Sequence, residues 1–266
     1  MIEAYEQTVL EFLGPQAIAD AKAHAIAEFP KESCGFIAGG VYFACENKNA
    51  EPTKEFEIRD ERYDAAFAAG AVTAIIHSHP YGPMVPSGLD MSQQIATGVP
   101  WVIIVLNEQG VHKTVAWGGN LPIAPVIGRP FVHGIFDCYS LVRDVFRLGK
   151  EGMAAQGISW PHDPVELPEV ARADNWWQGE DDLYVAHLAP VGFKQISRSE
   201  AREGDGFLCA LGDSRANPNK RLNHAALIVE RDQVLHHFTN HLSARKPAGA
   251  WARAAEMWVR YEGSSK

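Results

Sequence analysis

The chain has 266 residues, of which 46% are hydrophobic and 21% charged, a composition typical of globular protein and a length sufficient for two domains. Its 33 acidic residues outnumber the 24 Lys and Arg, giving a net charge of −9, which argues against a nucleic acid partner because phosphate binding requires basic clusters. No run approaches the roughly 18 apolar residues of a membrane span, and the acidic start Met1–Glu6 lacks the basic residues of a secretory signal.

The first half of the chain alternates helical and extended patterns. Apolar residues recur at helical spacing in some segments, and short β-branched runs lie between them. We predict strands near 34–39, 41–45, 72–77, 101–106 and 111–117, and helices near 17–29, 60–69 and 88–96. Such alternation predicts a layered α/β arrangement.

The most informative stretch of this half is His77-Ser78-His79-Pro80, which follows a short apolar run. Residues two apart on a strand point to the same side, so His77 and His79 are expected as a pair of imidazoles on one face. Ser87 follows after seven intervening residues and is suited to cap a helix whose first turn holds Asp90. Two imidazoles and a carboxylate, with a fourth position for water, form the ligand set of a catalytic zinc site. A structural His-x-His beside a capping serine is the alternative.

A metal-bound water also needs a base, and Glu32 offers one where the helix near 17–29 gives way to a strand. The order Glu, His-x-His, seven residues, Ser, two residues, Asp resembles the JAMM (MPN+) metalloprotease family over residues 1 to about 120. The resemblance implies one zinc ion bound by His77, His79 and Asp90. It further implies proton transfer by Glu32 and stabilisation of the developing oxyanion by Ser87.

Glycine and proline cluster between residues 118 and 130, where the charge also changes. Residues 1–122 hold 7 Lys/Arg against 15 Asp/Glu, net −8, and residues 123–266 hold 17 against 18, net −1. Gly/Pro-rich boundaries are typical of linkers. We predict a domain over 1–120, a linker over 121–130 and a second domain over 131–266.

The second half shows one clear helix, a long irregular middle, and strands near 206–211, 224–229 and 234–238. Cys138 falls in the first turn of the helix, which Asp137 or a neighbour can cap. The N-terminal end of a helix favours an anion, so we expect a lowered thiol pKa and a better nucleophile. Cys34, Cys45 and Cys209 lie in apolar, strand-like runs and are predicted to be core residues, with no disulfide framework.

A histidine, His224, begins the strand that follows, and two more end the next strand. A cysteine, an activating histidine and a third polar residue make the generalised catalytic triad. A two-residue loop that pairs Glu230 with Gln233 would favour His237 as the neighbour of His224, whereas a three-residue loop would favour His236. Periodicity leaves both open.

The run Asp137–Val142, with His224 and a polar residue twelve positions later, resembles the NlpC/P60 family of papain-like cysteine peptidases over about 130 to 240. The resemblance implies a papain-like α+β fold with Cys138 as nucleophile, His224 as base and His236 as orienting residue. The chain departs from the pattern in two ways: Tyr-Ser replaces the usual Ser-Gly after the cysteine, and the middle segment is long.

A JAMM unit followed by an NlpC/P60 unit resembles the tail tip assembly proteins of lambda-like siphophages over essentially the whole chain. This resemblance implies a protein of the virion tail tip, present in the host cytoplasm during assembly. It implies peptidoglycan stem peptides as substrate, other phage tail tip proteins as partners and two peptidase activities. Two alternatives remain: an assembly scaffold that uses its enzymatic folds for docking, and a zinc isopeptidase that processes a tail protein.

Overall fold

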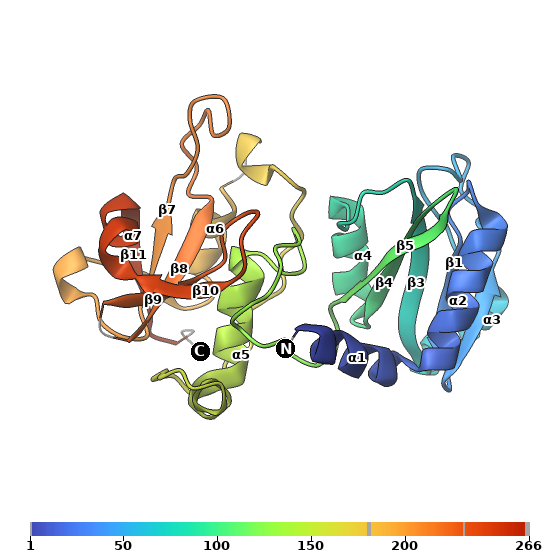
Figure 1. The fold of residues 1–266 in the computed structure, drawn as a ribbon, viewed down its shortest axis with the longest axis horizontal. Coiled ribbons are helices and arrows are strands. Elements are labelled where there is room, and N and C mark those ends of the chain that lie inside the picture. Colours follow the sequence, from blue (N-terminus) through green and yellow to red (C-terminus); the bar gives the residue numbers. More distant parts are fainter. Residues whose placement is uncertain (1, 180–181, 231, 264–266) are drawn as a thin grey trace. The chain divides into compact units, whose positions relative to one another are not determined.

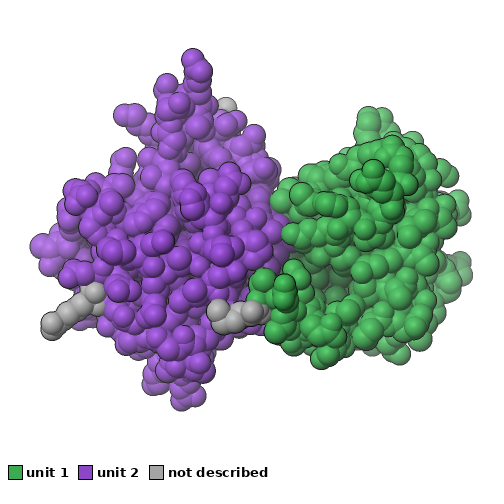
Figure 2. All heavy atoms as spheres, in the orientation of Figure 1, with its two compact units in different colours: residues 1–122 green, residues 123–266 purple. Residues whose placement is uncertain are grey.

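The computed structural model describes residues 2–179, 182–230 and 232–263. The chain divides into two compact units, Met1–Pro122 and Ile123–Lys266 (Figure 2).

The division falls inside the segment 121–130 that we predicted as a linker, and most of that segment belongs to the second unit. Arg129 is fully buried there, and its guanidinium donates to the carboxylate of Asp144 at 2.7 Å and to the carbonyl of Pro125 at 2.8 Å. Its backbone N–H donates to the hydroxyl of Ser243 at 2.9 Å. These bonds tie the segment into the core of the second unit.

The first unit is a mixed sheet with helices on both faces (Figure 1). Its elements are α1 (Ile2–Leu13), α2 (Pro15–Glu28), β1 (Cys34–Ala38), β2 (Val41–Cys45), α3 (Glu61–Ala68), β3 (Val72–Pro80), α4 (Gly88–Thr97), β4 (Trp101–Asn107) and β5 (Gly110–Trp117). The strand order is β2-β1-β3-β4-β5, in which β3 and β4 are parallel and every other pair is antiparallel.

Alternation along β3 decides which of its residues reach the site. Helix α2 contacts all five strands, and Ala74 and Ile76 of β3 pack into the core that it covers. Because successive strand residues point to opposite faces, His77 and His79 project from the other face, where Asp90 of α4 lies within reach of both. The predicted pairing of the two imidazoles on one face is confirmed.

The strands and helices predicted for this unit are present, and α1 was missed. Only Val9 and Leu13 of α1 are buried. The helix predicted near 17–29 begins at Pro15, whose fixed φ suits the first helical position.

The second unit is an antiparallel sheet packed against one long helix. Its elements are α5 (Cys138–Ala155), η1 (Trp176–Gln178), α6 (Leu183–Leu188), β6 (Phe193–Ile196), η2 (Arg198–Glu200), β7 (Gly206–Cys209), β8 (His224–Glu230), β9 (Gln233–His236), β10 (Ala244–Pro247), α7 (Ala248–Ala254) and β11 (Ala255–Tyr261). The strand order is β10-β9-β8-β7-β11-β6.

Helix α5 contacts β8, so the helix that starts at the cysteine lies on the strand that starts at the histidine. Leu141, Val145 and Phe146 of α5 share a buried core with Leu227 and Val229 of β8. The sequence interpretation missed β6, β10 and β11, as well as α6 and α7; β6 and β10 have only four residues each, too few for a clear periodicity.

Cys34, Cys45 and Cys209 are buried and free, as predicted for core residues. In the described part of the chain no helix combines the length and the apolar character that crossing a bilayer requires.

Candidate functional site

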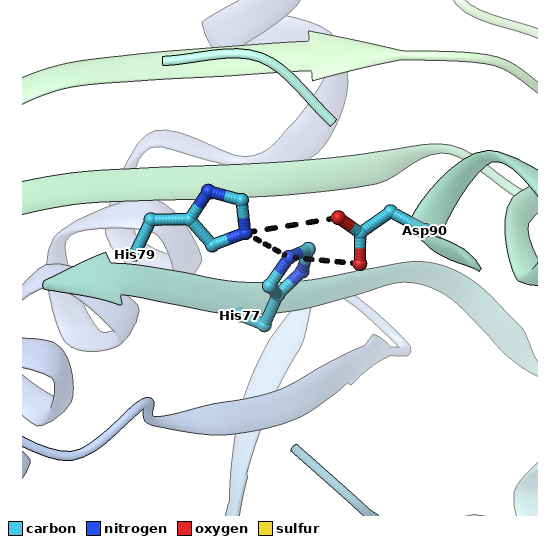
Figure 3. A group of neighbouring side chains, drawn as sticks. All are labelled: His77, His79 and Asp90. Atoms are coloured by element: carbon cyan, nitrogen blue, oxygen red, sulfur yellow. Dashed lines mark hydrogen bonds and ion pairs between the residues drawn. The ribbon is translucent and has the colours of Figure 1, made fainter. Parts of the chain in front are cut away.

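Three side chains of the first unit converge on one point between β3 and α4 (Figure 3). The Nε2 atoms of His77 and His79 lie 3.0 Å apart. Carboxylate oxygens of Asp90 lie 3.4 Å from Nε2 of His77 and 3.7 Å from Nε2 of His79. All three residues are buried.

The donor set fits a tetrahedral metal ion. Ligand atoms held about 2.0–2.1 Å from zinc at tetrahedral angles stand about 3.3 Å from one another. The two Nε2 atoms are 3.0 Å apart, and each histidine has a different oxygen of Asp90 nearby, at 3.4 and 3.7 Å, so that one ligand atom from each residue lies within 4.8 Å of the others. Nδ1 of His79 lies 2.8 Å from the carbonyl oxygen of Pro83, which fixes the tautomer that leaves Nε2 free as a ligand. Burial lowers the pKa of His77 to about 3, so the ring is in the neutral form that binds metal.

The start of α4 orients the carboxylate of Asp90. Ser87 caps the helix by accepting the backbone N–H of Asp90 at 3.0 Å, and Asp90 in turn accepts the backbone N–H of Ser87 at 2.7 Å. This reciprocal capping box holds Asp90 at the helix start while its carboxylate faces the histidines. The predicted capping role of Ser87 is thus confirmed.

Glu32 lies in the turn before β1 and lines the same cleft as His79, Ser87 and Asp90. The side chain is buried, and burial, together with the charges of Asp90 and Glu55, raises the pKa of Glu32 to about 8. A carboxyl group that titrates near neutral pH can both accept and return a proton. Glu32, His79, Ser87 and Asp90 therefore line one cleft of about 680 Å³, and His77 lies buried behind it, against His79 and Asp90.

Two residues that shape this cleft were missed by the sequence interpretation. Phe56 stacks on the ring of His77 with centroids 4.6 Å apart. Asn47 donates to the carbonyl of Glu32 at 2.9 Å and to that of Glu55 at 3.0 Å, and so holds the loop that carries Phe56 against the site. No local pattern marks either residue, because both act through contacts across the fold.

In the second unit Cys138 is the first residue of α5, and Asp137 caps the helix by accepting the N–H of Ser140 at 2.8 Å. The Sγ atom of Cys138 lies 3.2 Å from the hydroxyl of Tyr184 and 3.9 Å from the backbone carbonyl oxygen of Asn223. A thiol that donates to Asn223 leaves a sulfur lone pair that accepts the hydroxyl of Tyr184.

The expected lowering of the thiol pKa is wrong. Burial raises the pKa of Cys138, and the negative charge of Asp137 raises it further, whereas the bond from Tyr184 and the charge of Arg172 act in the opposite direction. Burial also lowers the pKa of His224 to about 3. The helix start alone therefore does not produce a thiolate, and the cysteine and the histidine rest in their neutral forms.

His224 begins β8 directly after Asn223 and lines a cleft of about 240 Å³ together with Cys138. Aromatic residues of the long middle segment form part of the wall of this cleft: Trp176, Trp177 and Tyr184. Tyr184 was not predicted, since nothing in the sequence around α6 connects it with the cysteine.

The hairpin between β8 and β9 decides which of the two following histidines adjoins His224. Glu230 pairs with Gln233, the register that taken alone favours His237. The register then shifts between Ile228 and Glu230, so that Ala226 pairs with His236 and even-numbered residues face each other.

The rings of His224 and His236 consequently lie with centroids 5.5 Å apart and planes at 89°. The ring of His237 packs instead against Phe131, with centroids 5.2 Å apart. Trp251 of α7, another residue that the sequence interpretation missed, contacts the rings of both His224 and His236, at 5.2 and 4.2 Å. It thus stabilises their mutual orientation.

Comparisons with known proteins assign the two halves of the chain to two different families. Residues 15–117 match the family of prokaryotic homologues of the JAB domain, and residues 115–260 match the NlpC/P60 family. The chain is 36% identical to the tail tip assembly protein K of Escherichia phage N15, over 90% of this chain and 92% of that protein. It is 30% identical to the tail tip assembly protein K of Escherichia phage lambda, over 72% of this chain and 79% of that protein.

Among solved structures, a protein of Desulfitobacterium hafniense is 22% identical and covers 39% of this chain and 78% of its own, with a TM-score of 0.29, too low for a structural argument. The two family matches together span residues 15–260, and each of the two phage proteins aligns with more than two thirds of the chain. The protein belongs to the family of tail tip assembly protein K, with an N-terminal JAB-like domain and a C-terminal NlpC/P60 domain.

Proposed function

We propose that the protein acts at the virion tail tip as a cysteine endopeptidase that cuts peptidoglycan stem peptides, and that its first unit is a zinc-dependent peptidase or isopeptidase. The observation that carries the proposal is the cleft that Cys138 and His224 share, with the ring of His236 beside His224. In this proposal the protein is assembled with other tail tip proteins in the host cytoplasm and carried to the next cell wall.

The neutral resting pair determines how the peptide bond is cut. As Sγ of Cys138 attacks the carbonyl carbon, the thiol proton passes to His224, which acts as general base. His224 then returns the proton to the leaving nitrogen, and the acyl group remains as a thioester. Water hydrolyses the thioester with His224 again as base, and this releases the acid and restores the thiol. His236 orients His224 and fixes its tautomer.

The hydroxyl of Tyr184 is expected to contribute to this reaction, because it lies 3.2 Å from the attacking sulfur. Tyr184→Phe should lower kcat about tenfold to a hundredfold with little change in KM, as for the loss of a hydrogen bond to a developing charge, worth about 1.5–3 kcal/mol. Steady-state cleavage of a stem peptide measures the effect. Tyr139→Phe is the matched control, since the hydroxyl of Tyr139 bonds to the carbonyl of Pro168; equal losses in both variants would rule out a specific role for Tyr184.

The pH dependence of thiol alkylation tests the neutral resting state. The thiolate is the reactive form, so a raised pKa moves the rise in reactivity to higher pH. We expect alkylation of Cys138 by iodoacetamide to have a midpoint above the ordinary value of about 8.5. Mass spectrometry of the full chain between pH 5 and 11 gives the profile, and a midpoint below about 7 would contradict the neutral pair and support a preformed ion pair.

In the first unit His77, His79 and Asp90 would hold the zinc ion. The ion would supply Lewis-acid polarisation of the scissile carbonyl and a lower pKa for water. Glu32 takes a proton and hands it to the leaving nitrogen, a role that suits its raised pKa. The hydroxyl of Ser87 lines the cleft and stabilises the developing oxyanion.

Digestion of purified muropeptides by the full chain tests the proposal. Cleavage by wild type and by His79→Ala, but not by Cys138→Ala, would assign the cell-wall activity to the second unit. Chelator-sensitive processing of a tail protein, with wall digestion unchanged, would assign the first unit to that isopeptidase role. If neither the Cys138→Ala nor the His79→Ala variant reduced the yield of infectious particles, the two folds would serve assembly as docking surfaces, and the peptidase proposal would fail.

A further inference from the structure

The long irregular segment between α5 and α6 carries a buried cation, Arg172, whose side chain is 3% exposed. Neither the sequence motif around the cysteine nor the proposed mechanism accounts for a buried guanidinium at this place. A buried charge is costly unless it is paired and fully hydrogen-bonded, so its partners indicate what it does.

Those partners surround Cys138. Arg172 donates to both carboxylate oxygens of Asp137, at 2.8 and 2.9 Å, and to the hydroxyl of Ser140 at 2.8 Å. It also donates to the carbonyl of Gly134 at 3.2 Å. The guanidinium therefore holds the residues before and after the nucleophile in one bidentate, charge-assisted network.

The same network places charges around the sulfur. Asp137 precedes the nucleophile, and its carboxylate disfavours a thiolate, whereas the charge of Arg172 favours one. The other titratable or charged groups that line the cleft with Cys138 are His133, Tyr139, Asp174, Tyr184, His224 and His237. None of them pairs with both oxygens of Asp137, so Arg172 is the cation placed to neutralise the capping carboxylate.

We propose that Arg172 is a positioning residue for Cys138: its bidentate pair with Asp137 neutralises the carboxylate that caps α5 and holds the first turn of the helix so that the thiol can ionise and attack. This inference rests on the proposed role of Cys138 as nucleophile. It assigns a function in positioning the nucleophile to the long middle segment, one of the two features in which the chain departs from the expected NlpC/P60 pattern.

Alkylation of Cys138 in the full chain tests the inference without any substrate. Arg172→Gln should slow alkylation by iodoacetamide about tenfold near pH 8, since one unit of thiol pKa changes the thiolate fraction tenfold below the midpoint. Arg172→Lys, which keeps the charge, should recover most of the rate. The double variant Asp137→Asn with Arg172→Gln removes both charges and should return the rate to within about threefold of wild type.

Arg143→Gln is the matched structural control. Arg143 also joins α5 to the middle segment, through Glu169 at 3.2 Å, but it does not contact Asp137. Equal slowing in Arg143→Gln and Arg172→Gln, or no slowing in Arg172→Gln, would overturn the inference. If thermal melting shows that Arg172→Gln does not fold, Arg172→Lys and the double variant decide, and slow alkylation in both would contradict the charge role.

The readout separates this inference from the proposed function. A tenfold slowing in Arg172→Gln with no cleavage of muropeptides by wild type would uphold the role of Arg172 and reject the substrate. Unchanged alkylation in Arg172→Gln, together with cleavage of muropeptides by the wild-type chain, would reject the role of Arg172 and uphold the substrate.

Discussion

Cys138→Ala should lower kcat/KM for cleavage of stem peptides by about four orders of magnitude or more, because removal of a catalytic nucleophile leaves only binding and oxyanion stabilisation. The sulfur lies at the start of α5, 3.2 Å from the hydroxyl of Tyr184 and 3.9 Å from the backbone carbonyl oxygen of Asn223, and neither of these groups can replace a thiol as nucleophile. Mass spectrometry of muropeptide digests by the full chain measures the loss.

Cys209→Ala provides the control for this prediction. Cys209 is buried in β7 and pairs across the sheet with His224, so its loss removes a thiol close to the site without touching the cleft. We expect cleavage by this variant to stay within a few-fold of wild type, with a modest decrease in stability from the lost packing. If Cys138→Ala cleaved stem peptides at the wild-type rate, the cysteine peptidase mechanism would be excluded.

His79→Ala should abolish stoichiometric zinc binding. The purified wild-type chain should hold about one equivalent of zinc, and the variant should bind it more than about 100-fold more weakly, since loss of an outer-shell partner alone costs 10–100-fold. His79 supplies one of three converging ligand atoms, and its own orientation is set by the carbonyl of Pro83. Elemental analysis and calorimetric titration of the metal-free chain measure the change.

His112→Ala is the control for metal binding, because His112 lies on β5 of the same unit, exposed and outside the cleft. It should retain wild-type stoichiometry and affinity. Zinc bound by His79→Ala with wild-type affinity would show that the three converging residues are not the metal site. Melting curves of the metal-free proteins establish that both variants are folded.

The first unit was largely predictable because its signals are local. Alternation along one strand determines that His77 and His79 share a face, and the serine at the start of the next helix has a side chain suited to cap it. Whether Asp90 reaches the histidines depends on how α4 crosses the sheet, which sequence spacing does not state. The contacts of Asn47 and Phe56 with the site likewise cross the fold and leave no periodic signal.

The second unit shows where local reasoning ends. The loop rule taken alone selects His237, and a single register shift near Val229 reverses the parity and brings His236 to His224. A bulge is chosen by packing on both sheet faces, so it is invisible in the strand pattern. The thiol pKa was mispredicted for a related reason, because burial and the charge of Asp137 outweigh the helix start.

By itself the sequence determined the residue types, their order and the strand and helix that carry each of them: an imidazole pair with a carboxylate in one half, a helix-start cysteine and a strand-start histidine in the other. The tertiary structure alone decided that His236 lies beside His224, that the pKa of Cys138 is raised, and that Tyr184, Trp251 and Arg172 contact Cys138, His236 and Asp137, respectively. The physical reason is that pairing register, desolvation and charge neutralisation depend on neighbours distant in the chain, whereas side-chain periodicity depends only on neighbours within it.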